Sequence, residues 1–252
     1  MKSLSKQRKV ITYDQIGSGR SSPLEAKLQR AETLVSDLDR LLHKLGTSEF
    51  HLLGTSWGGT LALEYYFRKK GRGIASLILQ SPLVSAKEWT KDATRLLRTL
   101  PQKEQRVIAA CIEVGATDSA VYKNAEKTYY KKYVYRGKID KKRARYFKKY
   151  PNLHGHELYQ RMWGDSEFTA TGLLKNYDRT PDLKHIHVPT LFICGQYDEA
   201  TPATIKKFSK KVKGSQVEVI ESASHSILSE RPAAMLACVA RFLNEVEGTK
   251  RA

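Results

Sequence analysis

The sequence predicts an α/β fold in which a parallel sheet carries an inserted helical cap. Apolar and β-branched runs alternate with helical patterns near both ends of the chain. Between them, residues 85–178 show helices and polar loops without convincing strand alternation. The length of 252 residues suits one large core domain with one insertion. We therefore expect residues 1–84 and 179–252 to form the core and residues 85–178 to form the cap.

The elements of the first part follow from their periodicity and their breakers. Residues 9–13 are a short β-branched run that predicts a strand, and the glycine-rich residues 14–21 predict a loop. Residues 31–45 place leucines at helical spacing and are followed by Gly46, so we expect a helix there. Residues 74–80 are mostly apolar, as in parallel strands that are covered on both faces.

Strand patterns resume after the helical block. Residues 189–195 and 216–220 each read as a strand, and residues 232–246 as a final helix. Because strands alternate with helices, we expect a parallel sheet. The helical block would then cover the carboxyl ends of the strands, where open α/β sheets bind their ligands.

The formal net charge of +18 is concentrated in residues 122–150, where Lys and Arg interleave with tyrosines. One interpretation is a nucleic-acid surface of phosphate-binding cations and stacking aromatics. The interpretation that we favour is a pair of amphipathic helices with inward tyrosines and solvated lysines. Tyr129, Tyr130 and Tyr133 recur at helical spacing, which supports this second interpretation.

Several classes of protein are not expected. No run approaches the roughly 18 apolar residues of a membrane span, and the basic N-terminus has no apolar signal core behind it. Cys111, Cys194 and Cys238 are widely spaced and form no metal or redox motif, which is typical of thiols in a reducing compartment. We therefore expect a cytoplasmic protein without metal, cofactor or membrane partner.

Residues 54–58, Gly-Thr-Ser-Trp-Gly, fit the pattern G-x-S-x-G. Residues 49–53 before them read as a strand, and residues 59–66 after them read as the start of a helix. This context is typical of the nucleophile elbow of α/β hydrolases, in which small neighbours let a serine hold a strained backbone and expose its hydroxyl. The sequence therefore predicts Ser56 as a nucleophile.

A serine nucleophile needs a base and an acid that orients the base, and α/β hydrolases place them in the order Ser, acid, His. Asp198 lies three residues after Gly195, and His225 lies five residues after Ile220, each in the loop that follows a predicted strand. The carboxyl ends of parallel strands share one edge, so both side chains are expected to converge on Ser56. His225 would be the general base, and Asp198 would fix its tautomer.

Other candidates fit these roles less well. His51 lies inside a predicted strand and His43 on a predicted helix. Asp178, Asp182 and Glu199 are rivals for the acid, but none is so well placed after a strand.

Five strings add a resemblance. They are D-Q-x-G-S-G-R-S from Asp14, S-W-G-G-T from Ser56, W-G-D-S-E-F-T-A-T-G from Trp163, G-Q-Y-D-E up to Glu199, and Ser224-His225. Together they resemble the proline iminopeptidase family of α/β-hydrolase serine aminopeptidases, along nearly the whole chain. The resemblance implies release of an N-terminal residue, often proline, from small peptides through an acyl-enzyme on Ser56, without a cofactor.

The resemblance also implies how a free N-terminus is recognised. By motif match, the residues that bind the substrate ammonium are Glu167 in the cap and Glu199 beside the acid. The chemistry agrees, because two carboxylates in a buried site favour a cation and reject an internal amide. The alternative for either glutamate is a surface ion pair in a lysine-rich chain.

The oxyanion site departs from the family pattern. The backbone N–H of Trp57 is one implied donor, and the family's second donor comes from a His-Gly-Gly-Pro-Gly loop that this sequence lacks. We therefore expect a truncated start, without the first three strands. Either a gap opens between the strand at residues 9–13 and the strand before Ser56, or these two strands pair directly. Loss of one oxyanion donor costs about 10²–10³ in rate, so activity is expected to be impaired.

The leading hypothesis from the sequence is thus a serine aminopeptidase that acts on small peptides. One alternative is another α/β hydrolase, an esterase or amidase with the same three residues. The other is a non-catalytic remnant that binds nucleic acid or a protein through its basic cap, although a nucleic-acid partner is not expected.

Overall fold

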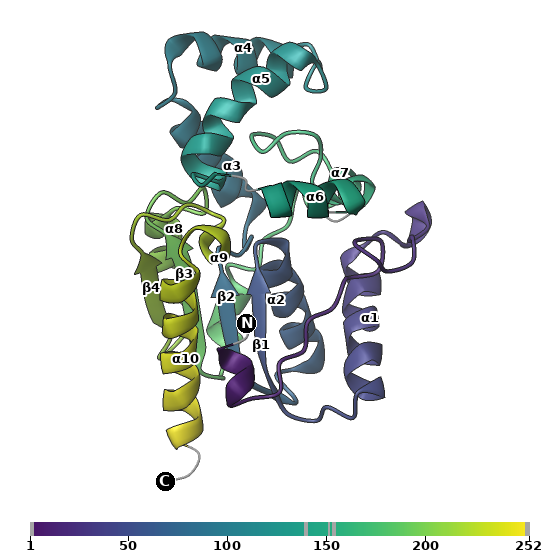
Figure 1. The fold of residues 1–252 in the computed structure, drawn as a ribbon, viewed down its shortest axis with the longest axis vertical. Helices are drawn as coiled ribbons and strands as arrows, with labels where there is room; N and C mark the ends of the chain where they lie inside the picture. Colours follow the sequence, from purple (N-terminus) through teal and green to yellow (C-terminus); the bar gives the residue numbers. More distant parts are fainter. Residues whose placement is uncertain (1–2, 139–140, 151, 153–154, 250–252) are drawn as a thin grey trace.

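The computed structural model describes residues 3–138, 141–150, 152 and 155–249. A sheet flanked by helices forms the lower part of the molecule, and a group of helices lies above it (Figure 1). The sheet has four parallel strands in the order β1-β2-β3-β4. They are β1 (Phe50–Thr55), β2 (Ile74–Gln80), β3 (Thr190–Gly195) and β4 (Gln216–Ile220). The parallel sheet and these four predicted strands are confirmed.

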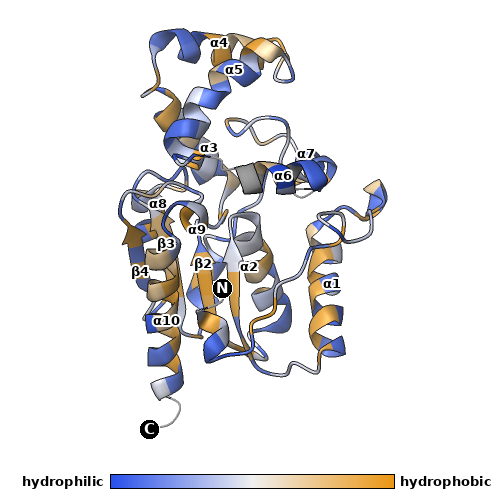
Figure 2. Cartoon of the chain, viewed as in Figure 1, coloured by the Kyte–Doolittle hydropathy of each residue, from blue (hydrophilic) through white to orange (hydrophobic). Residues whose placement is uncertain are grey.

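Helices cover both faces of the sheet. Because successive side chains of a strand point to opposite faces, neighbouring residues pack against different helices. Leu77 and Phe192 face a core with α1 (Ala31–Lys44), α2 (Trp57–Lys69) and α8 (Pro202–Ser209). Ile78 and Ile193 face the opposite core with α9 (Ile227–Glu230) and α10 (Pro232–Thr249). Because both faces are covered, β2 and β3 are buried along their whole length. This explains their apolar sequences (Figure 2).

The helices above the sheet lie at the carboxyl ends of the strands (Figure 1). They are α3 (Ala86–Leu97), α4 (Gln102–Glu113), α5 (Ala120–Tyr129), the π-helical turn η3 (Tyr130–Val134), α6 (Lys141–Lys149) and α7 (His156–Met162). Short 3-10 turns elsewhere are η1 (Leu4–Lys6), η2 (Ala26–Leu28) and η4 (Asp182–His185). We refer to α3–α7 as the cap, and the domain boundaries given above stay a prediction.

The tyrosines of the basic segment divide between two environments. Tyr122, Tyr129 and Tyr133 are buried in a small core of the cap, as the amphipathic interpretation requires. On α6, however, Tyr146 is 46% exposed, and the centre of its ring lies 5.0 Å from that of Tyr150, with the two rings tilted to each other. The described side chains of α6 include exposed Arg145, Lys148 and Lys149, and Tyr146 lies among them without the inward packing that the amphipathic interpretation requires.

The expected strand at residues 9–13 is wrong. No backbone hydrogen bond is made by the N–H groups of this segment among the described residues. Its neighbours explain why: Leu4 is buried against α10, and the guanidinium of Arg8 contacts Glu247 at 2.6 Å. These contacts hold the segment against α10. Of residues 9–13, Val10 packs against the core on this face of the sheet, as does Leu53 of β1. In the described part of the chain β1 is therefore an edge strand, and the direct strand pairing is not formed.

Two further findings concern the expected exclusions. Among the described residues no helix combines the length and the apolar composition that a membrane crossing requires. The three cysteines are all free thiols, and Cys194 and Cys238 are buried in the core.

Candidate active site

Ser56 occupies the turn between β1 and α2. Its backbone has φ 53° and ψ −120°, a left-handed conformation that is strained for a residue with a side chain. The two arms of the turn approach so closely that a Cβ on Gly54 would lie 2.1 Å from the carbonyl oxygen of Gly58. This contact explains the first glycine of G-x-S-x-G, because only glycine fits at that approach. The turn has the local geometry of a nucleophile elbow.

Asp198 follows β3, and its side chain is completely buried. One carboxylate oxygen accepts hydrogen bonds from the Ser81 hydroxyl at 2.6 Å and the Gly195 N–H at 3.1 Å. The other accepts from the Ala200 N–H at 2.9 Å and lies 2.8 Å from Nδ1 of His225. Four partners fix the carboxylate in one orientation, with one oxygen against the imidazole.

His225 lies in the loop between β4 and α9. Its carbonyl oxygen accepts from the Gln80 amide at 3.1 Å, and its ring meets that of Trp89 edge-on at 5.8 Å. Among the described residues no hydrogen bond joins the imidazole to the Ser56 hydroxyl. Such contacts are often long in free enzymes and shorten when substrate binds. The structure thus pairs His225 with Asp198 at the sheet edge that carries Ser56.

The electrostatic surroundings of His225 favour its charged form. Burial lowers its pKa, but the charge and hydrogen bond of Asp198, followed by the charges of Glu199 and Glu167, outweigh burial and raise the pKa to about 9. The imidazole is therefore expected to hold a proton at neutral pH when no ligand is bound.

Glu199 is adjacent to this pair and is only 4% exposed. One of its oxygens lies 3.9 Å from Nδ1 of His225, and the other has no hydrogen-bond partner. Burial raises the pKa of Glu199 well above its usual range, and the charge of Glu167 raises it further. A buried carboxylate in this position is stabilised by a cation that pairs with it.

Glu167 lies in the segment between α7 and η4 and is half-buried. A single oxygen of its carboxylate accepts two hydroxyl hydrogen bonds, at 3.2 Å from Tyr130 and at 2.5 Å from Tyr159. Its charge acts on Glu199 and on His225. Glu199 thus lies close to the imidazole of His225, and Glu167 acts on it through its charge; the described ion pairs show neither glutamate paired with a surface Lys or Arg.

Three residues near the site carried no sequence motif. Glu126 on α5 has its pKa raised to about 7, mainly by burial and then by the charge of Glu167. Ser81 directly follows β2 and holds φ 48° while its hydroxyl contacts Asp198. Gln80 joins Ser81 to the carbonyl of His225. In the sequence, the one indication that Ser81 lies near the site is its position directly after a buried strand.

Trp57 is the first residue of α2, and its N–H donates to no acceptor among the described residues. Its indole N–H donates to the Gln15 side chain at 3.0 Å. The loop that carries Gln15 is closed by an ion pair of 2.9 Å between Asp14 and Arg20. The D-Q string thus supports the elbow from outside the sheet.

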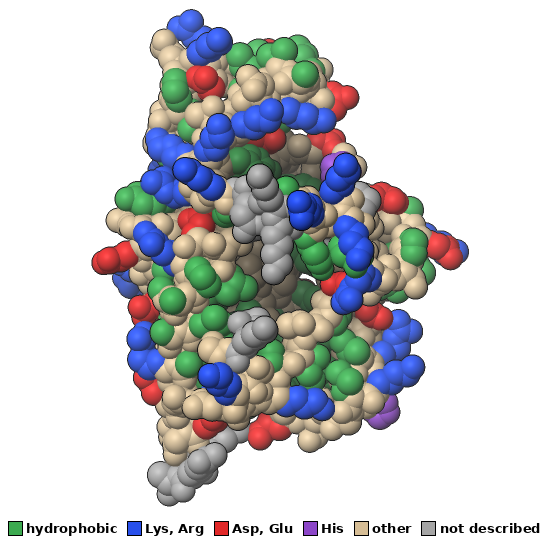
Figure 3. Space-filling view, in the orientation of Figure 1, with side chains coloured by type: hydrophobic (Ala, Val, Ile, Leu, Met, Phe, Trp, Pro, Cys, Tyr) green, Lys and Arg blue, Asp and Glu red, His purple; other side chains and the backbone are tan. Residues whose placement is uncertain are grey.

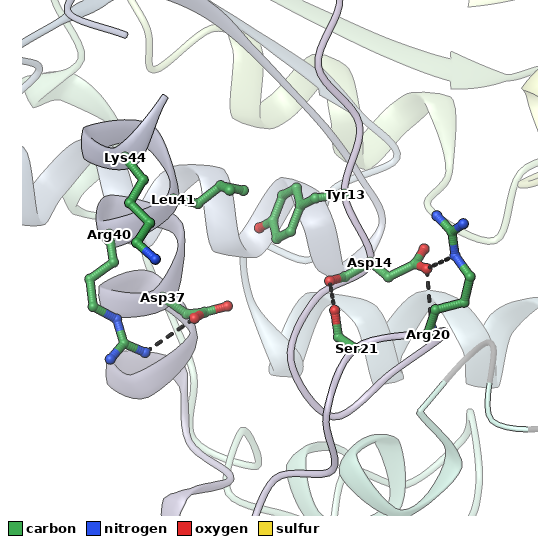
Figure 4. A pocket seen from close by; sticks show the side chains of 8 residues that line it. All are labelled: Tyr13, Asp14, Arg20, Ser21, Asp37, Arg40, Leu41 and Lys44. Carbon is green, nitrogen blue, oxygen red and sulfur yellow. Dashed lines mark hydrogen bonds and ion pairs between the residues drawn. The ribbon is translucent and has the colours of Figure 1, made fainter. Parts of the chain in front are cut away.

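Two hollows differ in character. The surface is hollowed between the cap and the core, with Lys and Arg side chains on its rim (Figure 3). A separate pocket of about 600 Å³ lies between the loop of Arg20 and α1 (Figure 4). Four of its charged groups pair with one another, Arg20 with Asp14 and Arg40 with Asp37 at 3.2 Å. None of the predicted site residues lines it.

Within the described ranges no cluster of three or more His, Cys, Asp or Glu side chains is arranged to hold a metal.

Known proteins are similar to this chain in sequence and in fold. Residues 1–232 match the alpha/beta hydrolase fold family. A proline iminopeptidase of Heyndrickxia coagulans is 39% identical over 247 residues, which is 98% of this chain and 85% of that protein. One from Clostridium botulinum is 34% identical over 239 residues, or 94% of this chain and 81% of that protein.

Solved structures of such proteins have a similar fold. The crystal structure of a proline iminopeptidase from Mycobacterium smegmatis superposes with a TM-score of 0.81 and 27% identity, covering 94% of this chain and 80% of that one. The structure of VinJ gives a TM-score of 0.82 and 29% identity, with coverages of 93% and 80%.

Proposed function

The chain belongs to the proline iminopeptidase family of α/β hydrolases, and from this premise we propose that it is a serine aminopeptidase that releases N-terminal residues, proline or other, from small peptides. The observation that carries the proposal is the pairing of His225 with Asp198 at 2.8 Å, directly beside the buried carboxylate of Glu199. A base next to an acidic subsite is what cleavage beside a free amine requires.

In the proposed reaction, the Ser56 hydroxyl attacks the first carbonyl of the peptide. Nε2 of His225 takes the hydroxyl proton, and Asp198 accepts the hydrogen bond from Nδ1 and stabilises the imidazolium. The Trp57 N–H donates to the oxyanion of the tetrahedral intermediate. His225 then gives its proton to the leaving amine, and an acyl-enzyme remains on Ser56. Attack by water, activated by the same histidine, releases the amino acid and restores the serine.

Glu167 and Glu199 restrict this reaction to the N-terminus. The substrate ammonium pairs with the two carboxylates, which compensates the unpartnered oxygen of Glu199. An internal amide carries no charge, so its binding would leave two carboxylates near each other without a cation. The alternative enzyme class, an esterase or amidase, acts on substrates without a free amine, and its reaction does not require these two carboxylates.

The nucleic-acid alternative would require exposed rings along the whole basic segment. Tyr122, Tyr129 and Tyr133 would have to offer their rings to bases, but they are buried in the core of the cap.

The ammonium assignment predicts a substrate-dependent loss. Glu167→Gln and Glu199→Gln should each lower kcat/KM for a prolyl arylamide by about 10- to 100-fold, because a charge-assisted hydrogen bond contributes about 1.5–3 kcal/mol. Hydrolysis of a short-chain aryl ester without an amine should change little. Glu113→Gln on the exposed surface of α4 is the matched control. Unchanged arylamidase activity in both variants would disprove the assignment.

The raised pKa of His225 predicts the pH dependence of the free enzyme. Phosphonylation of Ser56 by an uncharged fluorophosphonate should become faster as pH rises through about 9, because the imidazole must lose its proton before it can act as a base. Removing a negative charge by Glu199→Gln or Glu167→Gln lowers that pKa, so the midpoint should move to lower pH. The rate constant is measured at a series of pH values for the three proteins. A midpoint that stays or rises in both variants contradicts the electrostatic account.

A further inference from the structure

The cap segment from Tyr130 to Arg136 contacts both halves of the proposed site. At its start, the Tyr130 hydroxyl donates to the carboxylate of Glu167 at 3.2 Å. At its end, the Tyr133 carbonyl accepts from the N–H of His225 at 3.0 Å. The Val134 carbonyl accepts from the following N–H, that of Ser226, at 2.9 Å. One short stretch of backbone thus meets the ammonium subsite and the loop of the general base.

The π-helical form of this turn makes the second contact possible. The turn is closed by the Tyr135 N–H, which donates to the Tyr130 carbonyl at 2.8 Å. The last carbonyls of a helix have no partner within the helix, and those of Tyr133 and Val134 instead accept from the histidine loop. Single π turns of this kind are frequent at functional sites.

Side chains strengthen the attachment. The Arg136 N–H donates to Glu230 at 2.8 Å, and the other oxygen of Glu230 accepts from the Ser224 N–H at 2.8 Å. The Arg136 guanidinium also lies 4.1 Å from the centre of the Tyr197 ring. The segment is therefore joined to the loops after β3 and β4, which carry Asp198 and His225.

We propose that residues 130–136 are a positioning element that fixes the Glu167 carboxylate and the His225 loop in one frame, in which Tyr130 shares the positioning of Glu167 with Tyr159. The proposal rests on the proposed function. A fixed spacing between the ammonium subsite and the base suits a substrate in which amine and scissile carbonyl are joined by one carbon. The element thus sets the register at which a single N-terminal residue is removed.

Tyr130→Phe tests the first attachment, because it removes the hydroxyl and keeps the ring. We expect the KM of a prolyl arylamide to rise about tenfold with kcat nearly unchanged, and hydrolysis of an amine-free aryl ester to stay the same. Tyr65→Phe is the matched control, since its hydroxyl also donates to a carboxylate, that of Asp39 on α1 at 3.1 Å, outside the cap. An unchanged KM, or an equal loss on both substrates, overturns the role of Tyr130.

Glu230→Ala tests the second attachment, because it frees the histidine loop from Arg136. We expect kcat to fall about tenfold on both the arylamide and the ester, with the KM of the arylamide little changed. Glu230→Gln, which keeps a side-chain acceptor, should recover part of the loss, and thermal melts show whether each variant is folded. Wild-type kcat in folded Glu230→Ala contradicts the proposal. That failure leaves wild-type arylamidase activity and its loss in Glu167→Gln intact, whereas failure of the proposed function removes both.

Discussion

Replacing Ser56 by alanine is expected to lower kcat for a prolyl arylamide by about 10⁶-fold, as loss of the nucleophile does in serine proteases. KM should change little, because the ammonium contacts of Glu167 and Glu199 stay in place. Steady-state kinetics on the purified variant measures both. Activity within about tenfold of wild type would show that another residue is the nucleophile.

A glycine at position 56 is expected to increase the stability of the fold. Ser56 holds φ 53°, which costs about 1–3 kcal/mol for a residue with a Cβ and almost nothing for glycine. Ser56→Gly should therefore be inactive and yet melt at a higher temperature than the wild type, whereas Ser56→Ala keeps the strain. Calorimetry of the three proteins separates these effects. Equal melting temperatures for the alanine and glycine variants would contradict a strained elbow.

Replacing Asp198 by asparagine is expected to lower kcat by about 10⁴-fold. The carboxylate accepts from three donors besides the imidazole, those of Ser81, Gly195 and Ala200. An asparagine NH₂ would face one of these donors or Nδ1 of His225. The first arrangement breaks a buried hydrogen bond, and the second holds the imidazole in the tautomer that cannot accept the serine proton.

Asp182→Asn is the matched control, because Asp182 was a rival for this role in the sequence. Its carboxylate pairs with Arg179 at 3.0 Å and lies in η4. We expect its kinetics to match those of the wild type. A large loss in Asp182→Asn together with normal turnover in Asp198→Asn would reverse the assignment of the acid.

The core of the fold could be predicted because its signals are local. The strands β2 and β3 are mostly apolar because both faces of the sheet are covered, and the elbow needs a glycine at position 54, where two backbone segments touch. The order of the site residues follows from the parallel sheet, in which the carboxyl ends of the strands meet at one edge. These rules single out Asp198 and His225 as candidates among many acids and histidines, and the two side chains lie 2.8 Å apart in the structure.

The remaining features depend on contacts between distant parts of the chain. Residues 9–13 have strand-forming side chains, but the anchoring of Arg8 to Glu247 on α10 decides where the segment runs. The role of Ser81 appears only when it meets Asp198, more than a hundred residues away. The contact of the cap turn with His225 also cannot be predicted from the sequence of either segment. Backbone groups make this contact, and every residue type has the same backbone carbonyl.

Labelling with a fluorophosphonate tests the central claim most directly. The protein is titrated with the probe, the modified peptide is mapped by mass spectrometry, and prolyl arylamidase activity is followed in the same samples. We expect stoichiometric modification of Ser56, a loss of activity in proportion to labelling, and no modification of Ser56→Ala at the same site. Full activity in completely labelled protein, or labelling confined to another residue, would contradict a serine aminopeptidase that acts through Ser56.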